Sequence, residues 1–318
     1  MWTTIVLAVW GIYNAISFFF LMNPDLLHKH KDRLLMPTPT HHGKYIHAHK
    51  GGGDERPENS VQAYTHAKSL GITMLDTDVR LAQDNVLITI HDDNFMRTAG
   101  VSDLVVNTPS TSMPLMKDKV GGYDLQPSDS RAHTTLEQLF QAISSTDVLQ
   151  IELKDIGNSV SRTTLVNLIQ TYNRESTTIV GGSSSALNAQ FRSLDSTIPI
   201  FMPSDSVLKY FILYITGLLP FFPIEEDVAS LPYMYQERVH YVLNENPGWY
   251  GYLNVVVIWI MSHLCDPMIK HFNKRGIYTH YWTINYSTDL MREVLSTSIQ
   301  GMLTDRLVQS LGVLNSMS

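Results

Sequence analysis

The first 24 residues are almost entirely apolar, whereas polar and apolar stretches alternate through the rest of the chain. From Met1 to Pro24 there is no Asp, Glu, Lys or Arg, and Thr3–Met22 is a mostly apolar run of 20 residues. A helix of that length spans about 30 Å, the thickness of the hydrocarbon core of a bilayer. A cleaved secretory signal is the alternative, but the run has no basic start and no small-residue cleavage site. The pattern favours a transmembrane anchor over residues 1–24.

The residues that follow the anchor predict which side of the membrane the domain occupies. Residues 25–43 are expected to form a juxtamembrane linker, because they include the segment PTPTHHG. Basic residues dominate here and just beyond, at Lys29, Lys31, Arg33 and Lys44. The positive-inside rule therefore predicts that the following domain faces the cytoplasm. The single cysteine, Cys265, has no partner for an internal disulfide, which agrees with a reducing compartment.

From Lys44 onward, strand-like and helix-like patterns alternate. The predicted strands are Tyr45–His49, Thr73–Val79, Val86–His91, Val148–Leu153, Thr178–Val180, Ile198–Phe201, His280–Ile284 and Gly301–Thr304. The predicted helices are Glu58–Leu70, Thr135–Ile143 behind a T-x-x-Q capping box, Val160–Tyr172, Leu187–Leu194 and Leu290–Leu295. Such alternation is typical of an α/β domain with a parallel sheet, open or closed as a barrel, and we expect it over residues 44–318.

The second and third predicted strands are too close in sequence for a parallel crossover, which needs about a dozen residues. A hairpin that turns at Asp84 and Asn85 is expected instead. With a two-residue turn, Asp78 lies opposite His91.

Two later segments are unusually apolar. Val207–Ile224 contains Pro and Gly residues that interrupt a helix, and we expect a lipid-facing or re-entrant, membrane-associated segment there. Leu253–Leu264 is too short to span a membrane, and buried core is an equally good interpretation of it.

Composition narrows the functional classes. A content of 44% hydrophobic and 17% charged residues excludes a wholly disordered chain, collagen or a long coiled coil. The net charge of -7, without any basic stripe, argues against nucleic acid as a partner. The sequence does not indicate the oligomeric state.

Acidic residues lie at the predicted strand ends, where a parallel barrel gathers its catalytic groups. Asp76 and Asp78 share one face of the second strand, and Glu152 ends another strand. Three carboxylates in one pocket repel one another unless a cation neutralises them, and hard oxygen ligands favour Mg²⁺ or Ca²⁺. We therefore predict one divalent cation at these residues, although a D-x-D on a strand is more often solvated or paired.

Two histidines occupy similar positions and have pKa values suited to acid and base catalysis. His49 precedes three glycines, and His91 lies in the predicted hairpin. Glu58 either contacts the residues that form this site without binding the substrate itself, or is a carboxylate that stabilises the first turn of a helix.

The motifs HAHKGGG, RPENS, LDTDV and ITIHDD, followed by IELK, YWTIN and GMLTD, resemble the glycerophosphodiester phosphodiesterase family from about Lys44 to Leu311. The N-terminal span and YITGLLPFFPI resemble more narrowly its membrane-anchored lysophospholipase D subgroup. This resemblance implies a distorted TIM-type (β/α)8 barrel after one transmembrane helix, located at a membrane such as the endoplasmic reticulum or the perinuclear membrane. It also implies a lysophospholipid substrate at a lipid bilayer, cleaved to lysophosphatidic acid and an alcohol such as choline or ethanolamine.

The resemblance assigns roles by position. His49 and His91 are the expected acid and base, and Asp76, Asp78 and Glu152 are the expected metal ligands. Phosphate binding is expected at Lys50 and Lys154, and Trp282 is expected to wall the pocket. The family usually has Arg at the position of Lys50 and Glu at that of Asp76, so we expect a working but altered site. Hydrolysis of water-soluble glycerophosphodiesters and a catalytically weak, membrane-bound lipid-binding protein are the alternatives.

Overall fold

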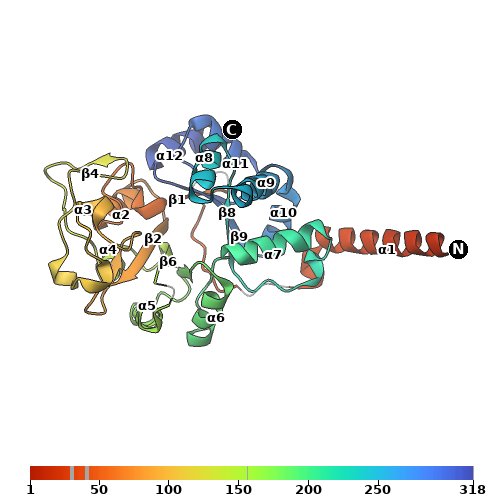
Figure 1. Cartoon of the computed structure of the whole chain (residues 1–318), viewed down its shortest axis with the longest axis horizontal. Helices are drawn as coiled ribbons and strands as arrows, with labels where there is room; N and C mark the ends of the chain where they lie inside the picture. The colour runs from red at the N-terminus through yellow and green to blue at the C-terminus, as the bar shows by residue number, and fades with distance from the viewer. Residues whose placement is uncertain (29–31, 40–42, 156, 318) are drawn as a thin grey trace.

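The computed structural model describes residues 1–317 except residues 29–31, 40–42 and 156, and its centre is a barrel of parallel strands (Figure 1). Seven strands lie side by side in the order β7-β6-β2-β1-β10-β9-β8. They are β1 (Tyr45–Ala48), β2 (Met74–Leu81), β6 (Val148–Leu153), β7 (Thr178–Gly181), β8 (Val228–Pro232), β9 (Tyr278–Trp282) and β10 (Gly301–Thr304). Single parallel bridges from Ile200 to Val180 and from Phe201 to Val228 complete the ring. The expected TIM-type barrel is therefore confirmed.

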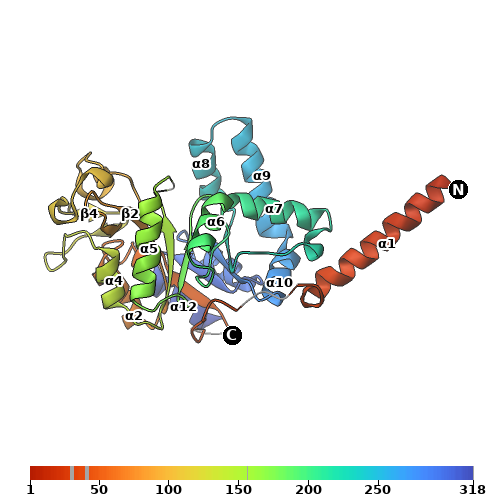
Figure 2. The ribbon, with the colours of Figure 1, turned by 90° about the horizontal axis from the view of Figure 1, so that it is seen from below.

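Helices follow the strands and surround the barrel (Figure 2). They are α2 (Val61–Ser69), α4 (Leu136–Ala142), α5 (Ser159–Thr171), α6 (Ser185–Leu194), α7 (Ser204–Ile215), α10 (Asp266–Lys274), α11 (Thr288–Ser296) and α12 (Leu307–Ser316). The predicted capping box is present, because the Thr135 hydroxyl accepts from the Gln138 backbone while the Gln138 side chain accepts from the Thr135 backbone. Helix α2 begins later than predicted, because Ser60 is its N-cap.

Two connections are longer than the rest. Between β2 and α4 the chain forms β3 (Leu87–Thr89), α3 (Met96–Ala99) and the short strands β4 (Lys119–Val120) and β5 (Tyr123–Asp124). Between β8 and α10 it forms α8 (Gln236–Glu245) and α9 (Trp249–Leu264), which make a hairpin that projects from the barrel (Figure 2). One-turn 3-10 helices lie at Pro24–Leu26 (η1), His49–Gly51 (η2), Val105–Asn107 (η3), Ser110–Ser112 (η4) and Leu219–Phe221 (η5).

The hairpin of β2 and β3 exists, but its predicted register is wrong by one residue. Val79 pairs with Thr89, and the Ile90 backbone N–H donates to the Asp78 carbonyl over 3.0 Å. The reason is the loop, which has three residues instead of two and places Asn85 at a left-handed φ of 62°. Ile90 is therefore opposite Asp78, and His91 lies one residue beyond.

Apolar side chains fill the amino-terminal end of the barrel. This buried layer consists of Tyr45, Met74, Val148, Ile179, Phe201, Val228 and Tyr278, which come from every strand position of the ring except β10. Leu34 and Met36, from the segment after the N-terminal helix, pack against it. Arg33 adds an ion pair to Asp227, with 2.9 Å between Nη1 and Oδ1. Because this end is filled and covered, polar side chains gather at the carboxyl end.

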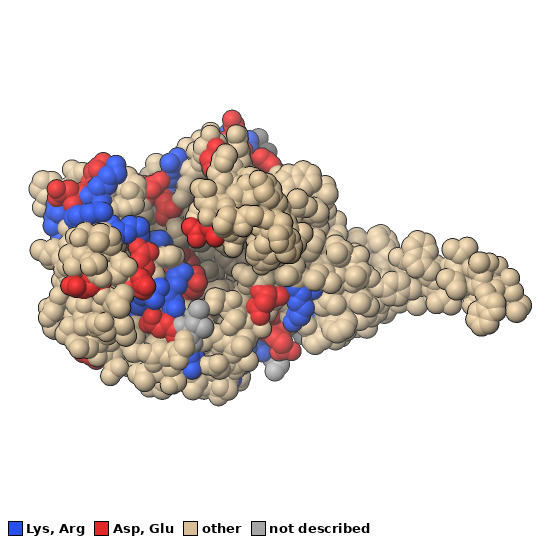
Figure 3. All heavy atoms as spheres, viewed as in Figure 1, with Lys and Arg blue, Asp and Glu red and all other residues tan. Residues whose placement is uncertain are grey.

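Helix α1 (Trp2–Met22) is, within the described residues, the one helix that alone is long and apolar enough to cross a membrane. Its second half packs against the body of the protein. The Ser17 hydroxyl donates to the Gly217 carbonyl over 2.6 Å, and the ring of Phe20 meets that of Phe221 edge to face. The rest of α1 is exposed and carries no charged side chain (Figure 3).

The two other apolar segments form helices with exposed apolar faces. Helix α7 buries Val207, Tyr210 and Phe211 against the barrel and exposes Leu208, Ile212 and Ile215. For α9, the interpretation as buried core does not hold, since only Gly251, Met261 and Ser262 are buried. The hairpin holds most of α9 away from the barrel, so its apolar side chains have no strand surface to cover. The predicted basic residues Lys29 and Lys31 lie outside the described residues.

Candidate active site

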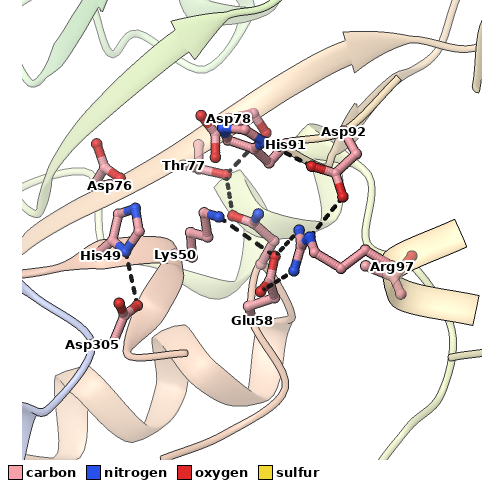
Figure 4. Close-up of polar contacts among 12 residues, drawn as sticks. His49, Lys50, Glu58, Asp76, Thr77, Asp78, His91, Asp92, Arg97 and Asp305 are labelled. Carbon is pink, nitrogen blue, oxygen red and sulfur yellow. Dashed lines mark hydrogen bonds and ion pairs between the residues drawn. The ribbon is translucent and has the colours of Figure 1, made fainter. Parts of the chain in front are cut away.

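The predicted site residues lie at the carboxyl ends of three neighbouring strands, β1, β2 and β6 (Figure 4). His49 directly follows β1, and Asp76 and Asp78 lie on the same face of β2. In the parallel pairing of β2 with β6, Asp78 is the partner of Glu152. The barrel therefore brings these four side chains to one rim although they are far apart in the sequence.

His49 is oriented by the carboxylate of Asp305, which lies next to it where the last strand of the barrel, β10, pairs with the first, β1. Its Nδ1 atom lies 2.8 Å from Oδ1 of Asp305, which directly follows β10, the neighbour of β1. Asp305 is itself fixed by Asn285, whose amide donates to Asp305 Oδ2 and whose Oδ1 accepts from the Asp305 backbone. The ring nitrogen that does not face Asp305 is directed toward Asp76 (Figure 4).

These surroundings favour the protonated form of His49. Burial alone would lower the pKa of His49, but the charge and hydrogen bond of Asp305, together with Asp76, raise it to about 9. His49 therefore carries a proton at neutral pH.

His91 is oriented by a carboxylate in the same way. Its Nδ1 atom lies 2.8 Å from Oδ1 of Asp92, and Asp92 Oδ2 accepts from Arg97 Nε over 2.6 Å. The side chain of His91 is 45% exposed, compared with 21% for His49. A cavity of about 440 Å³ opens beside it, lined in part by Arg80 and Arg97. His91 is therefore the histidine that solvent and a substrate reach more easily.

Glu58 belongs to the polar network of the site and not to a helix. Its two oxygens accept from the two terminal nitrogens of Arg97, both over 2.7 Å, and Lys50 Nζ lies 3.7 Å from Oε1. Glu58 is buried and precedes the N-cap of α2, so it is not the first-turn carboxylate that the sequence allowed. The chain Glu58, Arg97, Asp92 thus connects the loop after β1 to His91.

Lys154 lies between two of the carboxylates. Its Nζ atom is 3.0 Å from Asp78 Oδ1 and 2.9 Å from Glu152 Oε2. Burial alone would raise the pKa of Asp78, but Lys154 and Lys50 outweigh burial and lower it. In contrast, burial raises the pKa of Asp76 to about 7; the charge of His49 opposes this shift, and Asp78 and Glu152 add to it. Lys154 thus neutralises part of the negative charge of Asp78 and Glu152, while Asp76 has no lysine partner among the described ion pairs.

The three carboxylates fit a hard divalent cation in chemistry, although they are not gathered around one point. Among the residues that the structure describes, no group of three or more His, Cys, Asp or Glu side chains is close enough to hold a metal. However, Asp78 Oδ2 is buried without a hydrogen-bond partner in the described structure. A buried carboxylate oxygen of this kind is satisfied when it coordinates a cation.

Trp282 is the last residue of β9 and lies at the same rim, half-buried. The guanidinium carbon of Arg238, in α8, lies 4.5 Å from the centre of its ring, and Arg238 Nη2 donates to the Trp282 carbonyl over 2.9 Å. Helix α8 of the α8–α9 hairpin therefore holds Trp282 in place through Arg238.

Four residues of the network were not assigned a role from the sequence: Asp92, Arg97, Asn285 and Asp305. Asn285 and Asp305 end the motifs YWTIN and GMLTD, so a signal was present. Their role depends on the pairing of β1 with β10, which joins the two ends of the chain.

Comparison with known proteins agrees with this geometry. Residues 49–197 match the sequence pattern of the Glycerophosphoryl diester phosphodiesterase family. The human protein named Lysophospholipase D GDPD1 is 28% identical over 307 residues, which cover 94% of this chain and 93% of that protein. The human Lysophospholipase D GDPD3 is 27% identical and covers 93% of this chain and 90% of its own. By these measures the chain is similar to the glycerophosphodiester phosphodiesterase family.

Solved structures of the family share its fold. A putative glycerophosphoryl diester phosphodiesterase from Silicibacter pomeroyi has a TM-score of 0.64 at 13% identity, covering 90% of this chain and 96% of that one. A phosphodiesterase from Oleispira antarctica was solved with the product sn-glycerol-3-phosphate. It has a TM-score of 0.63 at 16% identity, and the match covers 86% of this chain and 97% of that one. These similarities support a phosphodiester hydrolase, and glycerophosphodiester phosphodiesterases generally use a divalent metal.

Proposed function

We propose that this protein is a lysophospholipase D: it cleaves the head-group side of a lysophospholipid and yields lysophosphatidic acid and an alcohol such as choline or ethanolamine. The observation that carries the proposal is the pair of carboxylate-oriented histidines, His49 with Asp305 and His91 with Asp92, at one rim with Asp78. Two relatives that cover nearly the whole chain are named for this activity. The apolar α1 supplies a reason for a lipid substrate.

The chemistry that we assign to the histidines follows from their surroundings. His91, the more exposed of the two, accepts the proton of the attacking glycerol hydroxyl of the substrate. As that oxygen bonds to phosphorus, the bond from phosphorus to the head-group oxygen breaks, and His49 supplies the proton that the leaving alcohol needs. Water then opens the cyclic phosphate. Lys50 and Lys154 stabilise the negative charge of the phosphoryl oxygens.

A divalent cation, Mg²⁺ or Ca²⁺, would be held by Asp76, Asp78 and Glu152 and would supply further stabilisation of charge on the phosphate. Asp76 has a shorter side chain than the Glu that the family usually has at this position. Lys50 replaces an Arg, so a single ammonium group stands in place of a forked guanidinium. We expect these differences to alter the affinity for phosphate without removing it.

We place α1 in a bilayer as a single-pass anchor, with the barrel on the cytoplasmic side. Arg33 and Lys44 are the described members of the basic set that follows the helix. The endoplasmic reticulum and the perinuclear membrane are the membranes that we propose.

Water-soluble glycerophosphodiesters are the second candidate substrates. The charged side chains at the mouth and the glycerol phosphate in the Oleispira antarctica structure favour a small polar ligand. In this case α1 only localises the enzyme.

The test is an assay of the purified full chain on lysophosphatidylcholine and on glycerophosphocholine, each with EDTA or with added Mg²⁺ or Ca²⁺. We expect release of choline from lysophosphatidylcholine that depends on the cation and is lost in His49→Ala and Asp78→Ala. His66→Ala is the matched control, because His66 also pairs with a carboxylate, that of Glu55, but is not part of the site formed by His49, His91 and Asp78. Turnover of glycerophosphocholine alone would establish the second candidate, and turnover of neither would point to a lipid-binding protein.

A further inference from the structure

The α8–α9 hairpin carries a long uncharged stretch on which many large apolar side chains are exposed. Residues 246–265 contain no Asp, Glu, Lys or Arg. Large apolar and aromatic side chains are exposed along it, namely Trp249, Tyr250, Tyr252, Leu253, Val256, Trp259 and Leu264. Trp249 is 77% exposed and Tyr252 is 63% exposed, values that an isolated soluble domain rarely tolerates in a cluster.

The chemistry of this cluster is that of a membrane interface. Trp and Tyr are enriched where a protein meets the boundary between lipid head groups and acyl chains, since their rings are apolar and their edges polar. Helix α9 has 16 residues, or about 24 Å, which is short of a full span. The chain then bends by 66° into α10, whose Phe272 packs into the core. This geometry suits a helix that dips into one leaflet and not one that crosses the bilayer.

The cluster continues a surface that α1 already defines. The loop after α7 contacts α1 through Gly217 and Phe221, and α10 holds the end of α1 through His271, whose Nδ1 lies 3.0 Å from the Leu21 carbonyl. Helix α7 lies between α1 and the hairpin (Figure 2), and its side chains Ile212 and Ile215 are exposed. Figure 3 shows that charged side chains crowd the opposite half of this view and are sparse here.

We propose that the exposed face of the α8–α9 hairpin inserts into the interface of the bilayer that α1 enters. The occupant is lipid, because the exposed part of residues 246–265 is uncharged and rich in Trp and Tyr, and because α7 links it to the helix that is apolar enough to span. The hairpin then acts as a second, shallow contact that fixes the tilt of the barrel.

The hairpin also connects the membrane to the mouth of the site. It leaves the barrel after β8 and is braced internally, since the Ser262 hydroxyl accepts from the Met234 backbone over 2.9 Å. Arg238 of α8 holds Trp282 at the rim. Insertion of the hairpin therefore places the carboxyl-end rim of the barrel beside the lipid surface. That this position helps a lipid substrate to enter the site rests on the proposed function.

Quenching of tryptophan fluorescence by brominated phosphatidylcholine tests the insertion in the full chain. The sequence has five tryptophans, at positions 2, 10, 249, 259 and 282. One variant, W2F/W10F/W282F, keeps only the hairpin pair. The matched variant, W2F/W10F/W249F/W259F, keeps only Trp282. Both are placed in nanodiscs that hold one copy, and circular dichroism verifies their folding.

The expected result is that the hairpin variant loses roughly half or more of its emission in brominated lipid, whereas the Trp282 variant loses at most about a tenth. Equal, weak quenching of both would overturn the proposal. Shielded, blue-shifted emission without quenching would also overturn it, because protein would then cover the hairpin, as in an association of two copies outside the nanodisc. If the variants fail to fold, quenching of the natural chain is compared with that of W249F/W259F, which must be the less quenched of the two.

A kinetic measurement separates this inference from the proposed function. W249S/W259S is expected to lower turnover of lysophosphatidylcholine in phosphatidylcholine vesicles by about fivefold or more and to leave glycerophosphocholine turnover within about twofold. If the natural enzyme cleaves no lysophospholipid, the proposed function fails, yet the quenching result still decides the insertion. Equal loss on both substrates would contradict a membrane role for these two side chains.

Discussion

His49 Nδ1 and Asp305 Oδ1 are 2.8 Å apart across the seam at which the last strand of the barrel meets the first. A carboxylate in this position selects the tautomer of the imidazole and stabilises its protonated form. The site thus depends on a contact between residues that are 256 positions apart in the chain.

Asp305→Asn is predicted to reduce kcat by about 100-fold, because the amide neither fixes the ring nor stabilises its charge. The loss of the carboxylate also lowers the pKa of His49, which the native protein raises to about 9. The alkaline limb of the kcat profile should therefore move toward neutral pH. Asp289→Asn, at an exposed carboxylate of α11, is the control. An unchanged alkaline limb would show that Asp305 has only a structural role.

Arg97→Lys is predicted to lower kcat by about tenfold with little effect on thermal stability. Lysine cannot replace both hydrogen bonds to Glu58 while also holding Asp92, so His91 loses its fixed orientation. The matched control is Arg131→Lys, which alters a similar pair with exposed Asp118. Measurement of kcat and of the melting temperature of both variants separates positioning from stability; equal activity would contradict the network.

Acid is predicted to destabilise the fold through a buried histidine far from the rim. Burial lowers the pKa of His280 to about 3, whereas an unfolded histidine has a pKa near 6.5. Below pH 6.5 the unfolded chain binds a proton that the folded chain does not, so stability falls toward pH 3 by up to about 1.4 kcal/mol per pH unit. This contribution is constant above pH 6.5.

The measurement is the free energy of unfolding between pH 8 and pH 5 for the natural chain, His280→Gln and the control His66→Gln. His280→Gln should have a shallower dependence on pH, even though it loses the hydrogen bond between His280 and Ser230 and is less stable overall. A slope identical to that of the natural chain would refute the assignment.

Addition of Mg²⁺ or Ca²⁺ is predicted to raise the melting temperature, because a cation relieves the repulsion among Asp76, Asp78 and Glu152. At 100 times the dissociation constant the gain is about 2.7 kcal/mol, or several degrees for a chain of this size. Asp78→Asn should abolish the gain, whereas Asp124→Asn, at an exposed carboxylate, should keep it. A gain that persists in Asp78→Asn would place the cation elsewhere.

The sequence patterns predicted the strands well where they are apolar and bounded by turn residues, as at Val148–Leu153, whereas closure into a barrel was implied by the family resemblance. They missed β8, whose sequence VASLP is short and ends in proline, and the helices between β8 and β9. The missed α9 has apolar residues on all sides, so it lacks the 3.6-residue period that marks a barrel helix. The register of the β2–β3 hairpin failed because a left-handed Asn85 lengthens the turn by one residue.

For the site, residues at the ends of strands were predictable because the barrel collects these ends on one rim. The supporting residues were not. Arg97 reaches Glu58 from a separate helix, and Asp305 reaches His49 only after the ring of strands has closed. Such contacts depend on tertiary geometry: the motif GMLTD marks Asp305, but only the closed ring of strands shows that it pairs with His49.

The hydrogen bond between Ser17 and Gly217, together with the edge-to-face contact of Phe20 with Phe221, fixes the second half of the N-terminal helix to the body of the protein. A barrel on a loose tether would tumble and meet lipids in every orientation. If this helix stands in a bilayer, as we propose, the barrel meets lipids in a restricted orientation, and its reaction rate follows the surface density of lipid in the plane instead of the bulk concentration.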